Sequence, residues 1–181
     1  MKEVIHRVPS KFEIERKWLL KELPKDVNIL KQYILHQSYI VAEDEVEVRL
    51  VIKYRPDDST VVGQKLTIKK GNGLSREEAE IKLTNKQIVK LLSHVEGGPP
   101  IIKKFFIAEI PGHSDLVLHF SQVDPDLDSS FFYAEVEFPS EEEAAAFQMP
   151  ANLAEYVIRE VTNEKSWQIK NYWRRTRMGA I

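Results

Sequence analysis

Cysteine is absent from the chain, and its absence excludes both disulfide bonds and zinc sites built from thiolates. An apolar run of membrane-spanning length is also missing, as is the charged and then apolar N-terminal pattern of a secretory signal peptide. These absences predict a cytoplasmic protein with no membrane partner.

No block of like charge dominates the chain. Its formal net charge is −2 at pH 7, and basic and acidic residues are interleaved except in a short basic run at 173–177. A general nucleic-acid surface is therefore not expected. The 181 residues, 43% of them hydrophobic, suffice for one core. We expect a single domain over residues 1–181, in which residues 1–10 are flexible.

The most informative segment is F-E-I-E-R-K-W at 12–18, where charged and bulky residues alternate. In a β-strand this period places Glu13, Glu15 and Lys17 on one face, with roughly 7 Å between successive side chains. Two carboxylates can hold a hard cation such as Mg²⁺ or Mn²⁺, and the lysine suits an anion that bridges to it, such as phosphate. The same alternation also fits a strand face exposed to water.

The alternation recurs later in the chain. Glu78 and Glu80 share one face of a middle strand, and Glu135 and Glu137 share one face of a late strand. Cations follow the same period between them, at Arg49 and in the K-L-T-I-K segment at 65–69. A closed barrel with a wet, charged interior would accommodate such faces, and so would an antiparallel sheet with one face in water.

Turn signals and local propensities divide the chain into eight predicted strands and three helices. The strands are predicted at about 11–20, 32–42, 45–55, 61–70, 75–83, 100–110, 115–122 and 131–139. The helices are predicted at about 85–93, from 141 to near 149, and at 163–177.

A set of short motifs appears in order between residues 12 and 165. They are E-I-E-R-K at 13–17, Q-S-Y at 37–39, V-R-L at 48–50, L-T-I-K at 66–69, G-L-S-R-x-E-x-E at 73–80, E-V-E-F at 135–138 and E-V-T-x-x-K at 160–165. The ordered set resembles the CYTH superfamily, the triphosphate tunnel metalloenzymes. Within the superfamily the chain resembles the small bacterial inorganic tripolyphosphatases, whose relatives include thiamine triphosphatases and class IV adenylate cyclases.

The resemblance implies an α+β fold, in which an eight-stranded antiparallel β-barrel with flanking helices binds a triphosphate in its tunnel. It assigns catalysis to Glu13, Glu15 and Lys17. It assigns divalent metal, Mg²⁺ or Mn²⁺, to Glu13, Glu15, Glu135 and Glu137. Phosphate binding falls to Lys17, Arg49, Lys69, Lys103 and Lys165, while Glu78 and Glu80 organise the cations and a second metal.

Three positions depart from the family pattern. Val51 and Phe105 replace tunnel arginines, and His119 stands where an aspartate is expected. Neutral imidazole is a good ligand for Mn²⁺ or Zn²⁺ and a poor one for Mg²⁺, so His119 is a candidate metal ligand; an inert strand residue is the alternative. Lys53 and Lys65 could compensate for the lost arginines if their side chains face inward.

Three functions remain open on this evidence. The first is metal-dependent hydrolysis of a triphosphate, with inorganic tripolyphosphate as the favoured substrate. The second is a binding protein for polyphosphate or nucleotide in which catalysis is weakened, and the third is a class IV adenylate cyclase. The expected partner is thus a triphosphate-containing small molecule or polyphosphate, and barrel edges could also pair into a homodimer.

Overall fold

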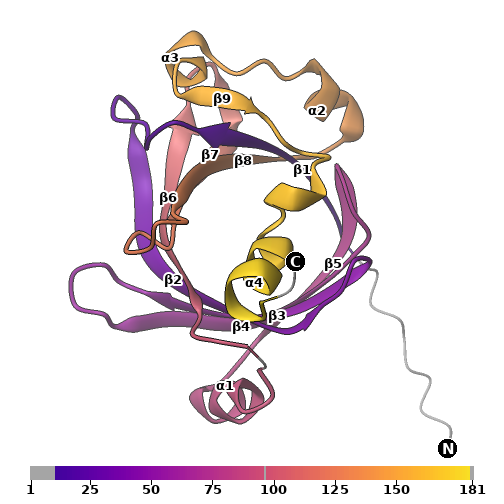
Figure 1. Cartoon of the computed structure of the whole chain (residues 1–181). Helices are drawn as coiled ribbons and strands as arrows, with labels where there is room; N and C mark the ends of the chain where they lie inside the picture. The colour runs from indigo at the N-terminus through magenta and orange to yellow at the C-terminus, as the bar shows by residue number, and fades with distance from the viewer. Residues whose placement is uncertain (1–10, 96, 180–181) are drawn as a thin grey trace, which may run out of the picture.

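The computed structural model describes residues 11–95 and 97–179. Within these ranges nine strands form one sheet in the order β5-β4-β3-β2-β6-β7-β8-β1-β9, and every pairing is antiparallel. A further pairing of β5 with β1 closes eight of these strands into a ring (Figure 1). The predicted α+β fold with an eight-stranded antiparallel barrel is confirmed.

Short helices accompany the strands. The strands are β1 (Lys11–Leu20), β2 (Ile29–Ala42), β3 (Val46–Tyr54), β4 (Val61–Lys70), β5 (Ser75–Lys82), β6 (Ile101–Ile110), β7 (His113–Val123), β8 (Phe131–Phe138) and β9 (Val157–Glu160). The helices are α1 (Asn85–Leu92), α2 (Glu141–Ala146), α3 (Ala151–Ala154), the 3₁₀ turn η1 (Lys165–Trp167) and α4 (Ile169–Arg177). Over the ranges that the structure describes, no helix has the length and hydropathy needed to cross a membrane.

The larger hydrophobic core lies outside the ring of strands. Alternate residues of β1, β7 and β8, among them Trp18, Phe120 and Val136, point outward and are buried. They pack with Phe147 and Leu153 from the segment that contains α2 and α3. Successive side chains of a strand point to opposite faces. Because the apolar residues pack on the outer face, the residues between them line the interior of the barrel.

Helix α4 covers one end of the barrel. Figure 1 looks along the ring of strands and shows α4 lying over it. Its residues Ile169 and Trp173 pack with Tyr39 of β2 and Tyr133 of β8 in a second apolar cluster. These contacts lie where β2 ends and β8 begins. The opposite end of the barrel, where β3 ends and β4 begins, is not covered by α4.

Several elements differ from the prediction. Strand β9 and helix α3 were not predicted, β2 and β7 begin three and two residues earlier than expected, and the last helix begins at Ile169 rather than at 163. The helix predicted to end near 149 ends at Ala146, because Phe147 is extended where its ring packs into the outer core. Strand β9 forms because β5 pairs only with the first part of β1, from Lys11 to Ile14. The second part of β1 leaves unpaired backbone groups at that edge, and β9 pairs with Trp18–Leu20 there. The predicted flexibility of residues 1–10 lies outside the described residues.

Candidate functional site

The barrel encloses a cavity of about 340 Å³ whose wall is densely charged. Strands β1 to β6 and β8 contribute lining residues from alternate positions, and β7 contributes His119. Among the described residues that line it, eight are cationic: Lys11, Lys17, Arg49, Lys53, Lys65, Lys69, Arg76 and Lys103. Seven are carboxylates: Glu13, Glu15, Glu47, Glu78, Glu80, Glu135 and Glu137. The predicted charged interior is therefore present.

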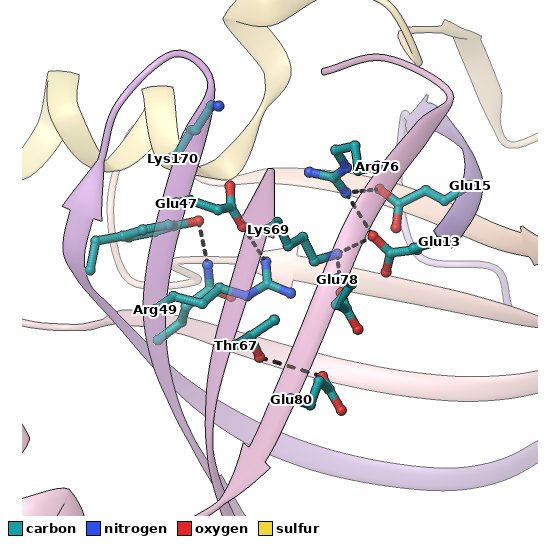
Figure 2. A network of polar contacts seen from close by, with 12 residues as sticks. Glu13, Glu15, Glu47, Arg49, Thr67, Lys69, Arg76, Glu78, Glu80 and Lys170 are labelled. Carbon is teal, nitrogen blue, oxygen red and sulfur yellow. Dashed lines mark hydrogen bonds and ion pairs between the residues drawn. The ribbon is translucent and has the colours of Figure 1, made fainter. Parts of the chain in front are cut away.

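One wall of the cavity is an alternating chain of carboxylates and cations from β1, β4 and β5 (Figure 2). Lys69 Nζ contacts Glu13 and lies 2.8 Å from Glu78 Oε2. Arg76 Nη2 lies 3.1 Å from Glu13 Oε2 and 2.9 Å from Glu15 Oε1. The Lys69 side chain is only 3% exposed, and such burial is a costly way to stabilise a fold. The chain of charges is typical of a binding site for a charged ligand.

A second group of charges lies around the buried ring of Tyr133 on β8. Lys17 Nζ lies 3.9 Å from the ring centre and 2.9 Å from Glu135 Oε1. Lys103 Nζ donates a hydrogen bond of 2.9 Å to the Tyr133 hydroxyl. Burial alone would raise the pKa of Glu135, but Lys17 and Lys103 outweigh it and hold that pKa at about 2. Glu135 is thus a permanent anion between two lysines.

The carboxylates of β1 and β8 repel one another. Burial and the nearby Glu135 raise the pKa of Glu15, while burial, Glu13 and Glu15 raise the pKa of Glu137 to about 7. A divalent cation among these oxygens would relieve the repulsion, so the donor set fits a hard metal ion in its chemistry. His119 Nδ1 lies 3.8 Å from Glu137 Oε1, and burial lowers the pKa of this histidine, which keeps the imidazole neutral at pH 7.

These carboxylates and His119 do not form a preassembled metal site in the described structure. Within residues 11–95 and 97–179, no three His, Asp or Glu side chains are placed so that they could hold one ion together. The ion pairs explain this, because Glu13 and Glu15 are directed at Arg76 and Glu135 is directed at Lys17. The carboxylates would have to exchange these cations for a metal.

Eleven of the twelve predicted site residues line the cavity. The exception is Lys165, which lies in the 3₁₀ turn η1. Its side chain is 60% exposed and its Nζ lies 3.7 Å from Asp44 Oδ2. The residues that face the cavity from this segment are Val161, Thr162, Trp167, Gln168 and Ile169. Lys165 therefore does not line the cavity, and the structure does not place it where it was predicted to bind phosphate.

Sequence reasoning did not assign a role to Arg76, Glu47 or Tyr133. Arg76 shares the inward face of β5 with Glu78 and Glu80, so strand parity alone could have found it. Glu47 Oε1 lies 3.2 Å from Arg49 Nη1. Because Glu47 shares the inward face of β3 with Arg49, strand parity could have found it as well. The importance of Tyr133 depends on two lysines from β1 and β6, and no local pattern in the sequence indicates that contact.

The replaced positions also face the cavity. Val51, Phe105 and His119 line it, and so do Lys53 and Lys65. Phe105 and His119 pack ring against ring, with centroids 5.3 Å apart. The inward orientation required for compensation by the two lysines is therefore present, and their role in binding stays a prediction.

Replacement of Lys103 by methionine is expected to stabilise the empty protein more at pH 6 than at pH 9. Burial lowers the pKa of Lys103 from its ordinary 10.5 to about 7, although Glu135 opposes the shift. A lysine whose pKa is lowered by folding reduces the free energy of unfolding by the full amount below pH 7, and by less and less as the pH rises toward 10.5. The difference between the two pH values should be roughly 2 to 3 kcal/mol, at about 1.4 kcal/mol for each pH unit between 7 and 9.

Urea unfolding of Lys103→Met and wild type at both pH values measures this difference. Lys104→Met is the matched control, because Lys104 is the next residue on β6 and is exposed. An equal effect of Lys103→Met at both pH values would show that Lys103 keeps an ordinary pKa in the fold.

Comparison with known proteins yields matches among solved structures alone. No protein-family model matches the chain, and no curated protein matches it. A crystal structure described as the hypothetical protein NE1496 has 26% identity and a TM-score of 0.57, and the match covers 89% of this chain and 97% of that one. A crystal structure described as the inorganic triphosphatase NE1496 has 25% identity and a TM-score of 0.57, covering 93% and 96%.

A third solved structure shows the fold alone. The PH1819 protein from Pyrococcus horikoshii has 14% identity and a TM-score of 0.61, and the match covers 82% of this chain and 92% of that one. All three matches therefore extend over most of both chains. The fold of this chain is therefore similar to that of these proteins.

Proposed function

We propose that this chain is a metal-dependent triphosphatase, because the solved structures similar to it include one described as an inorganic triphosphatase, in agreement with the resemblance to the triphosphate tunnel metalloenzymes. The favoured substrate is inorganic tripolyphosphate. One observation carries the proposal: four carboxylates of the neighbouring strands β1 and β8 share a cavity with lysines and arginines from the surrounding strands. The two kinds of group are those that a metal and a phosphate chain require.

The charge of the cavity supports joint binding of metal and substrate. Most of the cations are now paired with carboxylates, as in the Lys69–Glu13 and Lys17–Glu135 pairs. If Glu13, Glu15, Glu135 and Glu137 held a divalent cation, Lys17 would be released from Glu135 and Lys69 from Glu13 to bind phosphate oxygens. The net charge of the cavity is closer to zero with metal and triphosphate bound together than with either of them bound alone.

The residues have distinct tasks in the proposed hydrolysis. Lys17, Arg49, Lys69 and Lys103 bind and orient the phosphate chain, and Arg76 keeps Glu13 and Glu15 in place. Bound metal would supply charge neutralisation at phosphorus and activate a water molecule. His119 joins the candidate ligands through its neutral ring beside Glu137. The charged wall stabilises the negative charge that develops as the P–O bond breaks.

Binding without turnover is the second candidate. It is favoured by one observation, the apolar side chains of Val51 and Phe105 at cavity positions where arginines would bind phosphate. A class IV adenylate cyclase would need a purine pocket as well, and no separate observation supports one.

Phosphate release should require a divalent metal and should be fastest with tripolyphosphate. The experiment supplies tripolyphosphate, ATP or thiamine triphosphate with Mg²⁺, Mn²⁺ or Zn²⁺ singly, and excess chelator serves as the control. We expect no turnover in chelator, because the cavity carboxylates then remain paired with the cations. Higher activity with Mn²⁺ than with Mg²⁺ would support His119 as a ligand.

Each alternative has its own signature in the same assay. Turnover that persists in chelator would contradict metal dependence. Tight binding of tripolyphosphate without phosphate release would favour the binding protein, and formation of cyclic AMP from ATP would favour the cyclase.

A further inference from the structure

Two lysines of the cavity wall lack a carboxylate partner. Among the buried and half-buried cations that the structure describes there, all form an ion pair with a glutamate except Lys53 and Lys103. Lys103 is 5% exposed and contacts the Tyr133 hydroxyl. Lys53 is half-buried, and its Nζ lies 4.5 Å from the centre of the Tyr33 ring. Neither ammonium group forms an ion pair with a carboxylate in the described structure, although Glu135 attracts Lys103 and Glu80 attracts Lys53 from farther away.

The strand register places the backbones of these two lysines on either side of Leu35. Leu35 on β2 is the pairing partner of Lys53 on β3 and also of Lys103 on β6. The two lysine backbones are thus two strand spacings apart, about 10 Å. Lys103 Nζ is directed to Tyr133 and Lys53 Nζ to Tyr33, so a phosphate chain between them can contact one lysine at each end. Leu35 between them offers neither a hydrogen bond nor a countercharge, so no residue of this row replaces the missing anion.

The surroundings of Lys53 make its charge costly when the cavity is empty. Burial lowers the pKa of Lys53, and the nearby Lys65 lowers it further while Glu80 opposes the shift. Lys65 forms the ion pair with Glu80, so the direct contact of Lys53 is the weakly attractive face of the Tyr33 ring. An anion bound here would remove this cost.

The position of Lys53 relates directly to the lost arginine on the same strand. Val51 and Lys53 both face the cavity from β3, and Lys53 lies two residues closer to the strand end that α4 does not cover. Two residues along a strand correspond to roughly 7 Å. The chain therefore removes a cation at the depth of Val51 and presents another nearer to the uncovered end.

We propose that Lys53 is a substrate-binding residue that holds the terminal phosphate of the substrate nearest to the uncovered end of the barrel, while Lys103 and Lys17 hold the other end beside Tyr133. This inference rests on the proposed function, because it takes a linear triphosphate as the ligand. A chain of three phosphates extends from the deep lysine Lys17 toward Lys53, whereas diphosphate has one phosphate fewer to fill the same row. Lys53 thereby contributes to the preference for tripolyphosphate over diphosphate.

Steady-state kinetics and calorimetric binding of tripolyphosphate and diphosphate test the inference in four proteins. These are wild type, Lys53→Met, Lys53→Arg and Lys104→Met. In Lys53→Met we expect KM and Kd for tripolyphosphate to rise about 10- to 100-fold, the loss of one charge-assisted contact. The values for diphosphate should change less, and kcat should remain within about threefold. Lys53→Arg keeps the charge and should restore most of the affinity, while Lys104, which is exposed on β6, provides a control for the loss of one positive charge outside the cavity.

The outcomes separate this inference from the proposed function. Unchanged tripolyphosphate affinity in Lys53→Met, equal losses for both substrates, or an equal loss in Lys104→Met would each overturn the role of Lys53 while hydrolysis stands. A wild-type protein that binds tripolyphosphate without hydrolysing it overturns the proposed hydrolysis, and the calorimetric comparison still decides the role of Lys53. A wild-type protein that neither binds nor hydrolyses tripolyphosphate overturns both.

Discussion

Replacement of Glu135 by glutamine is expected to reduce kcat for tripolyphosphate hydrolysis by at least about a hundredfold, a loss typical of removing one charged group from a catalytic site. Glutamine keeps the shape of the side chain and can still accept a hydrogen bond from Lys17, but it removes the negative charge. That charge is present at every working pH, because Lys17 and Lys103 hold the pKa of Glu135 at about 2. Phosphate release at saturating substrate and metal measures the effect.

The control separates lost chemistry from lost structure. Glu155→Gln removes the same charge from an exposed position after α3 and should leave kcat unchanged. Thermal melting of both variants establishes that each remains folded at the assay temperature. Full activity in a folded Glu135→Gln variant would contradict the assignment of Glu135 to the catalytic centre.

Strand parity explains why so much of the interior could be predicted. Glu13, Glu15 and Lys17 alternate with Phe12, Ile14 and Trp18, and a strand has only two faces. Once one face carries bulky apolar residues, as at Trp18 in the outer core, the charges must line the other. The same rule holds for Glu135 and Glu137, and together with closure of the sheet it brings them to one cavity.

Parity does not determine which charges meet. Glu13 is contacted by Lys69 from β4 and by Arg76 from β5, and those contacts depend on barrel stagger and side-chain reach. The pairing of Glu13 with cations in place of a metal was therefore not visible in the sequence. For the same reason the unpaired state of Lys53 emerged only from its neighbours in space.

Tertiary contacts also override local helix signals near the C-terminus. The predicted helix from 163 would have placed Lys165 in its first turn, but residues 165–167 form a 3₁₀ turn and Gln168 is extended, with φ −71° and ψ 135°. Trp167 packs edge-on against Phe131 of β8, with ring centroids 5.4 Å apart. This anchoring delays the helix until Ile169 and leaves Lys165 on the exposed side.

Loss of one buried ion pair should destabilise the protein through helix α4. Arg177 Nη1 lies 2.7 Å from Asp124 Oδ2, and the two side chains are 5% and 2% exposed. Asp124 also accepts hydrogen bonds from the Tyr172 hydroxyl and the Ile102 backbone N–H. Arg177→Met removes the only cation paired with this carboxylate in the described structure, and leaving a buried charge without its partner costs about 3 to 5 kcal/mol.

Arg174 offers a matched control on the same helix. Its ion pair with Asp44 spans 3.2 Å, but the two side chains are 37% and 61% exposed, so Arg174→Met should cost less than about 1 kcal/mol. Urea unfolding of both variants measures the two free energies. Equal costs would show that burial does not set the strength of these pairs. A much larger cost for Arg177→Met would mean that α4 is fixed over the barrel end by its last turn, beyond the apolar contacts of Ile169 and Trp173.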